Sequence, residues 1–209
     1  RTLAITVYGG MDFCVIDELP PGRQPVKTRR ITPAKVAGLY EYVTEQARAG
    51  FQTYIVCPLV EESDKRDLTS VVNHFEELSS GPFHALRTGL LHGRMAFAEK
   101  DAVMHRFKRG EIDVLFSTTV IEVGIDCPNA TTIVIEDAPQ FGLTQLHQLR
   151  GRVGRGSEPS HCFLLGKYKT PEGKKRIEAM CRANSGFVTA EADLELRGRG
   201  GFRGVRQSG

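Results

Sequence analysis

Short apolar runs alternate with amphipathic stretches along most of this chain, and that alternation constrains its fold more than any other feature. The runs FQTYIVCPLV (51–60), DVLFST (113–118) and TTIVIED (131–137) are rich in β-branched residues and have the length of strands. Stretches with helical periodicity lie between most of these runs, and strands joined through helices form β-α-β units with a parallel sheet. We therefore predict one α/β domain over residues 32–168, with helices on both faces of a parallel sheet.

The expected elements come in a regular order within that domain. Helices are expected at about 35–49, 65–79, 98–110 and 143–152, and strands at 51–60, 86–93, 113–118, 131–137 and 160–166. The strand at 86–93 has the weakest pattern of the five. Gly50 and Gly110 are expected to stop the first and the third helix.

The two ends of the chain differ from this domain. Residues 1–31 hold a group of prolines beside a basic cluster, which favours an extended connector over the interior of an element. Residues 169–209 predict two helices that meet at Gly186, followed by a loop rich in glycine and arginine. We therefore expect three segments, divided after residues 31 and 168.

Composition limits the class of protein. With 209 residues, 40% of them hydrophobic and 25% charged, the chain is typical of a soluble globular protein with a core of its own. It contains no apolar run long enough to span a membrane. Its five cysteines are odd in number and far apart, so neither a disulfide framework nor a metal site is expected. They are typical of core residues in a reducing compartment such as the cytoplasm.

Positive charge is concentrated in the last third of the chain. From Gln145 onward the sequence has 13 Lys and Arg residues against 6 Asp and Glu residues, although the net charge of the whole chain is only +3. This distribution favours a polyanion as partner, with a basic tail that binds nothing as the alternative.

Polar residues follow several of the expected strands. Open parallel sheets bind ligands outside the carboxyl ends of their strands, where small hydroxyls and backbone N–H groups often contact phosphates. Candidates at such positions are His92, Arg94, Thr118, Thr119, Gly124 and Asp126. The Asp126 carboxylate could accept a hydrogen bond from a sugar hydroxyl, whereas the Ser-Thr-Thr run could instead be a helix cap. We expect these residues, together with the arginine stretch described next, to lie on one rim of the sheet.

The stretch QLHQLRGRVGRGS (145–157) sets three arginines among three glycines. Arginine presents a planar fork of donors that suits phosphate or carboxylate, and glycine lets a backbone approach a ligand closely. The alternative is a solvated helix end followed by a turn. The spacing of GRVGRG differs from that of the dinucleotide-binding fingerprint, and it opens no β-α-β unit after a strand.

Four of these segments, in order and spacing, resemble motifs IV to VI of the second RecA-like domain of superfamily 2 helicases. They are YIVCPLV, LLHGRM, STTVIEVGIDCPNA and QLHQLRGRVGRG. Together with ELPPGRQPVKT before them and GFVTAEADLELRG and RQSG after them, the chain resembles the RecG family of bacterial DNA helicases along essentially its whole length. Transcription-repair coupling factors share the fold and a similar tail, and are the less favoured assignment.

The resemblance implies a RecA-like fold and roles for particular residues. Arg152 and Arg155 match the arginines that reach the triphosphate held by the first RecA-like domain, and Gln148 would orient the phosphate or couple the cleft to it. Gly124 and Asp126 would lie near the ribose. The strand-end candidates His92, Arg94, Thr118 and Thr119 would contact DNA.

The tail resembles the translocation motif of that family, a helical hairpin and loop that couples closure of the cleft to movement on duplex DNA. The residues Arg176, Arg197 and Gln207 match it. The chain departs from the family pattern at Arg199 and Gly201, where a proline and a glutamate are usual, so a looser and more basic loop is expected. A capping hairpin with solvated arginines is the alternative.

The chain contains no phosphate-binding G-x-x-x-x-G-K-[ST] loop and no acidic pair that would hold Mg²⁺ after a strand. The resemblance therefore implies that ATP and Mg²⁺ are held mainly by a first helicase domain, and residues 1–31 match the end of that domain and the linker. The expected partners are that domain, a wedge-type DNA-binding domain and branched or forked DNA. We expect a monomeric bacterial enzyme at the nucleoid in the cytoplasm, inactive as this fragment alone. The competing hypothesis is a non-catalytic nucleic-acid-binding module.

Overall fold

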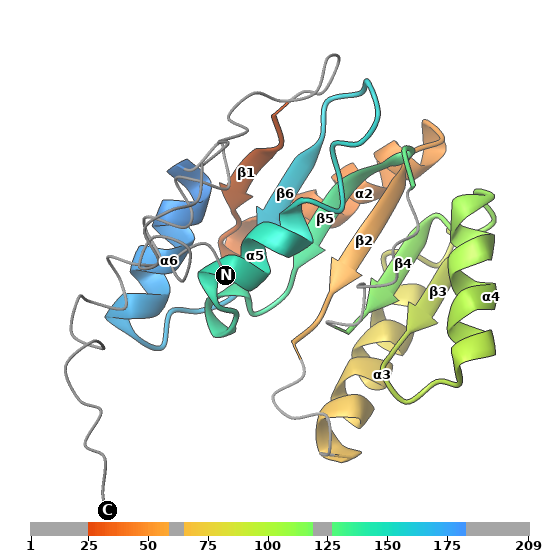
Figure 1. The fold of residues 1–209 in the computed structure, drawn as a ribbon, viewed down its shortest axis with the longest axis horizontal. Coiled ribbons are helices and arrows are strands. Elements are labelled where there is room, and N and C mark those ends of the chain that lie inside the picture. The colour runs from red at the N-terminus through yellow and green to blue at the C-terminus, as the bar shows by residue number, and fades with distance from the viewer. Residues whose placement is uncertain (1–24, 59–64, 119–126, 183–209) are drawn as a thin grey trace, which may run out of the picture.

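The structure, a computed structural model, describes residues 25–58, 65–118 and 127–182 (Figure 1). These residues form a six-stranded sheet in the order β1-β6-β5-β2-β4-β3, and all neighbouring strands are parallel. The strands are β1 (Lys27–Arg30), β2 (Gln52–Val56), β3 (Thr88–Leu91), β4 (Val114–Ser117), β5 (Ala130–Ile135) and β6 (His161–Leu164). The helices are α2 (Val36–Arg48), α3 (Lys65–Ser80), α4 (Phe97–Lys108), α5 (Leu143–Arg150) and α6 (Pro171–Arg182), with short 3-10 helices η1 (Pro33–Lys35) and η2 (Ala138–Gln140).

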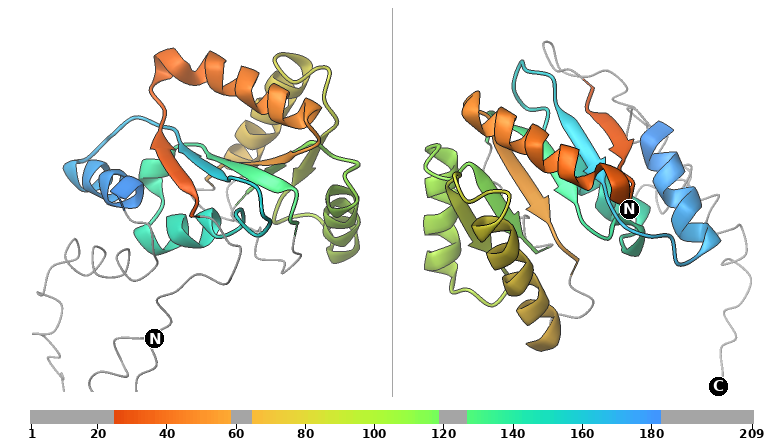
Figure 2. Two further views of the ribbon diagram at one scale, coloured as in Figure 1. Left: turned by 90° about the horizontal axis from the view of Figure 1, so that it is seen from above. Right: turned by 180° about the vertical axis from the view of Figure 1, so that it is seen from behind.

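The helices cover both faces of the sheet (Figure 2). On one face, apolar residues of α2 and α3 such as Leu39 and Val71 pack on the strand side chains that point towards these two helices. On the other face, α4, α5 and α6 contribute a second core, which includes Met104 and Leu146. Because β2 and β5 are buried along their whole length, their sequences do not alternate between apolar and polar residues. The predicted α/β fold is therefore confirmed.

Two of the helices end just before a glycine, as expected. Gly50 and Gly110 come just after α2 and α4 with φ of 87° and 72°, a left-handed conformation that ends helices and that only glycine adopts at little cost. The expected helices and strands within the described residues match the observed ones to within a few residues at each end. The second helix of the expected hairpin lies outside the described residues.

One strand was not expected. The sequence predicts an extended connector over Lys27–Arg30, but this segment pairs with β6 as the edge strand β1, from Lys27 opposite His161 to Arg30 opposite Leu164. Its sequence KTRR has no apolar pattern because an edge strand needs only backbone pairing on one side. In addition, Ile177 and Met180 of α6 belong to the same core as α5. The domain boundaries stay predictions.

The strand order reverses between β5 and β2. From β2 the chain continues through α3, on one face, towards β3, and from β5 it continues through α5, on the other face, to β6. In open parallel sheets the crevice at such a reversal, outside the carboxyl ends of the strands, is the usual place for a ligand. None of the described helices combines the length and the apolar character needed to cross a membrane.

Candidate functional site

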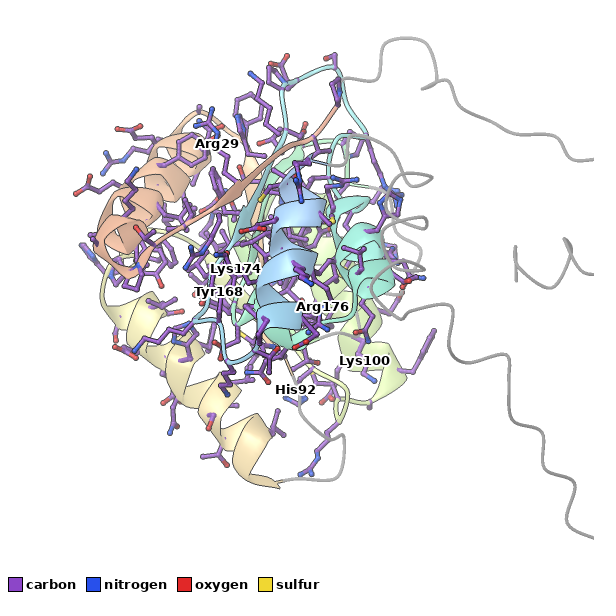
Figure 3. The ribbon with its side chains drawn as sticks, turned by 90° about the vertical axis from the view of Figure 1, so that its left-hand side faces the viewer. Arg29, His92, Lys100, Tyr168, Lys174 and Arg176 are labelled. Carbon is purple, nitrogen blue, oxygen red and sulfur yellow. The ribbon has the colours of Figure 1, made fainter. Side chains whose placement is uncertain are left out.

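The carboxyl end of β3 leads into a basic loop around His92. The His92 carbonyl accepts a hydrogen bond from the Met95 N–H at 3.2 Å, and Lys100 of α4 donates from Nζ to the Gly93 carbonyl at 2.6 Å. Burial, aided by the charges of Lys100 and Arg94, lowers the pKa of the His92 imidazole, so it is neutral at pH 7. Figure 3 labels His92 and Lys100. The loop thus combines a neutral imidazole with two cations.

Sequence reasoning missed Lys100, although its position near the start of a helix was a signal. A cation in the first turn of a helix is disfavoured by the helix dipole unless it has another use. Here its ammonium group fixes the backbone of the loop at Gly93, and Glu99, one residue earlier, accepts from the Ala96 N–H at 2.9 Å. The loop after β3 is therefore held in place by the helix that follows it.

Thr118 lies next to this loop, at the end of the neighbouring strand β4. Its N–H donates to the Leu91 carbonyl at 3.1 Å, so the strand ends that carry His92 and Thr118 are side by side, as expected. The Thr118 side chain is fully buried, and among the described residues its hydroxyl has no hydrogen-bond partner. The described contact of Thr118 is thus its backbone hydrogen bond, and a role of its side chain in DNA contact stays a prediction.

The arginine turn does not share this rim, and the expectation that it would is wrong. Helix α5 runs back against β5, so residues 151–157 come out at the amino edge of the sheet. A Cβ added at Gly156 would lie 2.9 Å from the carbonyl oxygen of Pro128, which comes two residues before β5 begins. Any ligand that meets both the His92 loop and the arginine turn must therefore extend across the molecule.

Within that turn, Arg152 and Arg155 are placed near one another on the α5 face of the sheet. Both charges act on the buried Tyr54, whose pKa is raised by burial and lowered in part by the two guanidinium groups. Arg155 is exposed and donates from Nε to the Gly151 carbonyl at 3.2 Å, while Arg152 is partly buried. Gln148 is exposed on α5 one turn before Arg152. The structure thus brings the three predicted residues to one outward surface.

Arg150, the first arginine of the stretch, points inward. It is 5% exposed, and its guanidinium donates to the Met180 carbonyl of α6 at 3.3 Å and to Thr28 Oγ1 of β1 at 3.4 Å. Its other amino group lies 3.1 Å from Nδ1 of His147. Burial and the Arg150 charge together lower the pKa of His147, which therefore remains a neutral acceptor. Arg150 joins three elements and is not available to a ligand.

The glycines of the turn serve its own packing. Gly154 has φ of 74°, which a side chain would strain, and Gly156 leaves no room for a Cβ against Pro128. Close approach was expected, but to a ligand or another domain. In the structure the close neighbour at Gly156 is this chain itself.

A cavity of about 320 Å³ opens at the reversal of strand order. Its lining consists of Cys57, Pro58, Ser70, Val71, His74, Glu136, Asp137 and Gln140. His74 Nε2 lies 3.7 Å from Glu136 Oε1, and the nearby Glu136 carboxylate raises the pKa of His74. Burial raises the pKa of the Cys57 thiol to about 12, so it stays protonated. Asp137 has φ of 44°, a strained conformation that often marks functional sites.

Arg176 has a defined place on α6. Its Nη2 donates to the Pro139 carbonyl at 2.8 Å, which ties α6 to η2, and among the described residues its buried Nε has no partner. The other predicted site residues, Thr119, Gly124, Asp126, Arg197 and Gln207, lie outside the described residues. Within the described ranges, no three His, Cys, Asp or Glu side chains are grouped so that they could hold a metal ion.

Comparison with known proteins identifies the family. Residues 34–157 match the family described as helicase conserved C-terminal domain, which is more than half of the chain. The chain belongs to the helicase C-terminal domain family. In this helicase domain the match includes the His92 loop, α5 and the arginine turn, so the motifs that carried the resemblance lie within it.

Two curated relatives extend the match of this helicase domain to the whole chain. The ATP-dependent DNA helicase RecG of Synechocystis sp. is 47% identical over 209 residues, which is all of this chain and 25% of that protein. RecG of Bacillus subtilis is also 47% identical over the whole chain, which covers 31% of its length. The chain thus spans about a quarter to a third of the length of the curated relatives it matches.

Solved structures agree with this assignment. A structure of RecG bound to a three-way DNA junction matches 96% of this chain, and 26% of its own chain, with a TM-score of 0.78 and 44% identity. The second domain of the DEAD-box helicase Mss116p, bound to an RNA duplex, matches 82% of this chain and 69% of its own with a TM-score of 0.59. At 15% identity the latter likeness concerns the fold alone. The predicted RecA-like fold class is confirmed.

Proposed function

We propose that this chain is the second motor domain of an ATP-dependent DNA helicase that remodels branched DNA, such as stalled forks and Holliday junctions, in recombination and repair. The observation that carries this proposal is identity of 47% along the whole chain to proteins named ATP-dependent DNA helicase RecG. A RecG structure with a three-way DNA junction supports branched DNA as the substrate. The enzyme would work as a monomer on the nucleoid in the bacterial cytoplasm.

In this proposal the arginine turn completes an ATPase site from across an interdomain cleft. Arg152 and Arg155 act as arginine fingers, and Gln148 orients the phosphate. Phosphoryl transfer is catalysed mainly by positioning and by charge stabilisation, and a guanidinium supplied from outside contributes about 10³–10⁵ in rate. The outward placement of these side chains on α5 and its turn supports this role. The first helicase domain would hold ATP and Mg²⁺, with Gly124 and Asp126 near the ribose.

The carboxyl edge of the sheet would form part of the DNA track. His92, Arg94 and Thr119 would meet backbone phosphates, and Thr118 would lead into the segment that contains Thr119. The electropositive surroundings of His92 support this assignment. Because this edge and the arginine turn lie at opposite ends of the strands, the domain can contact DNA and nucleotide at the same time.

Helix α6 would connect these two activities to movement on DNA. Arg176 ties α6 to the segment that leads into α5. A shift of α6 would therefore also move α5, the helix that carries Gln148. Arg197 and Gln207 would continue this coupling. We expect Gln207→Ala in the full-length protein to keep DNA-stimulated ATP hydrolysis and to lose unwinding. Equal loss of both activities would make Gln207 a catalytic or folding residue instead.

The test of the proposed function is ATP hydrolysis by the full-length protein with Mg²⁺, with and without saturating forked DNA, together with unwinding of a three-way junction. We expect hydrolysis to depend on DNA and the junction to be converted. No DNA-dependent hydrolysis would favour the competing hypothesis of a nucleic-acid-binding module. The same assay on this chain alone should give no turnover, and turnover there would show that it holds a nucleotide site of its own.

A further inference from the structure

The β1 edge of the sheet carries a dense group of cations. The spans 27–30 and 167–175 contain seven lysine and arginine residues and a single carboxylate, Glu172. All seven side chains are exposed; they are Lys27, Arg29, Arg30, Lys167, Lys169, Lys174 and Lys175, and we call them the edge patch. Figure 3 looks onto this side of the molecule, with Arg29, Tyr168 and Lys174 labelled.

The three segments that form the edge patch are fixed to one another. Strand β1 pairs with β6, and the connection from β6 to α6 brings Tyr168 against β1, where the Arg30 guanidinium lies 4.0 Å from the centre of its ring. Arg150 bridges Thr28 of β1 and the Met180 carbonyl of α6. The cations are therefore displayed on a rigid base of strand and helix, although they come from distant parts of the sequence.

The opposite edge of the sheet, formed by β3 and α4, is also rich in cations, but three of its arginines are paired with carboxylates. Arg87 pairs with Asp113, and Arg106 and Arg109 both pair with Glu111. In the edge patch, by contrast, the described residues provide one ion pair, a long contact of 3.9 Å from Lys174 Nζ to Glu178 Oε1. Uncompensated cations raise the local potential and attract a polyanion, whereas paired ones do so much less.

The distribution of these charges indicates the kind of anion. A single phosphate or carboxylate is bound by donors that converge on one point, but the edge patch is spread along a strand, a connection and the first turns of a helix. Such a layout matches a row of phosphates, and positioning contacts of this kind are independent of base sequence. Tyr168, stacked under Arg30, keeps that guanidinium extended at the surface.

We propose that the edge patch binds the phosphate backbone of a duplex arm of the branched DNA, as a second contact surface apart from the strand-end loops. This inference rests on the proposed function, because it needs a duplex arm held by the same protein. None of its seven cations belongs to α5 or the arginine turn, so it should set how firmly DNA is held without changing the chemistry of ATP.

The test uses the full-length protein with three exposed cations neutralised together, as Arg29→Gln, Lys169→Gln and Lys175→Gln. The matched control removes three exposed cations elsewhere, as Arg48→Gln, Arg106→Gln and Lys108→Gln, so that both variants lose the same net charge. Binding of a forked DNA with a duplex arm is measured across a salt series. Each lost phosphate contact should reduce the slope of log K against log salt by about one.

We expect the patch variant to lower that slope by roughly two to three and the control to leave it near the wild-type value. The turnover number at saturating DNA should be unchanged, while the DNA concentration that gives half-maximal stimulation rises. An unchanged slope, or an equal fall in both variants, would overturn the proposal. Wild-type protein that hydrolyses ATP without any response to DNA would instead contradict the proposed function.

Discussion

The inner and outer sides of α5 and its glycine turn use arginine for different purposes. On the inner side, Arg150 is 5% exposed and joins β1, α5 and α6 through its guanidinium. On the outer side, Arg155 is exposed and Arg152 is partly so, and Arg155 donates to the Gly151 carbonyl of its own turn. Arg150 and Arg152, two positions apart, thus differ because Arg150 lies on the core side of the last turn of α5, whereas Arg152 lies in the turn beyond the helix.

The comparison separates stability from activity. Outer residues of the turn should be needed for ATP turnover and not for folding, whereas inner residues should be needed for folding and affect turnover only through it. A substitution on the outer side that lowers the free energy of unfolding, or one on the inner side that lowers ATP turnover without affecting stability, would contradict this separation.

The largest effect is expected from Arg155→Lys in the full-length protein. Lysine keeps the charge but cannot reproduce the forked contact, so ATP turnover should fall by about 10³-fold, or about 4 kcal/mol of barrier. Binding of DNA and the free energy of unfolding should stay at wild-type values. Arg109→Lys, at an exposed site beyond α4, is the control. Normal turnover of Arg155→Lys would place the arginine finger elsewhere.

Arg150→Ala should have the reverse effect. It removes a buried guanidinium with three hydrogen-bond contacts and leaves the Met180 carbonyl without this donor, so the free energy of unfolding should fall by about 2–3 kcal/mol. Urea unfolding measures this change. Arg150→Met, which keeps most of the apolar stem, separates packing from hydrogen bonding. A stable Arg150→Ala variant with no ATP turnover would show that Arg150 belongs to the outer side.

The difference between the two arginines could not be predicted from the sequence. Apolar periodicity predicted α5 because Leu143, Leu146 and Leu149 all face the core. The burial of Arg150 depends on α6, which begins 21 residues later and provides the Met180 carbonyl. A pattern within one helix shows its apolar side, but it does not show which charged residue at the margin finds a buried partner from a distant element.

Two other features show the same limit from different causes. Strand β1 is an edge strand with exposed cations, and its sequence lacks the apolar pattern on which strand prediction relies. The placement of the arginine turn at the amino edge, in contrast, follows from topology, since a helix after a parallel strand returns the chain to the other edge. The position of the turn could therefore be predicted from the order of the elements, whereas strand β1 could be recognised only from its pairing with β6.

Gly156→Ala tests whether the glycines of the turn are needed for close packing within this chain. The added Cβ would lie 2.9 Å from the backbone carbonyl of Pro128, so the turn or the start of β5 must shift, at a cost of about 1–3 kcal/mol in the free energy of unfolding. Gly38→Ala is the matched control, since nothing lies within 4 Å of its Cβ position on α2, and there alanine should stabilise by about 0.5–1 kcal/mol. Thermal unfolding of the two variants should therefore shift in opposite directions. Equal shifts would mean that close packing is not why Gly156 is needed.

The smallest effect is expected at the cavity beyond β2 and β5, where the side chain of His74 is partly buried. The nearby Glu136 carboxylate raises the pKa of His74 in the folded state, so the protonated imidazole stabilises the fold below about pH 6.5, and this contribution is lost as pH rises through the raised pKa. Its side chain is 33% exposed, so solvent screening should keep the contribution below about 1 kcal/mol. Urea unfolding at pH 6 and pH 8 should show a smaller loss of stability for His74→Gln than for the wild type, and 1 M salt should reduce the difference between the two proteins. The same pH dependence in both would show that the His74 and Glu136 pair contributes nothing to folding.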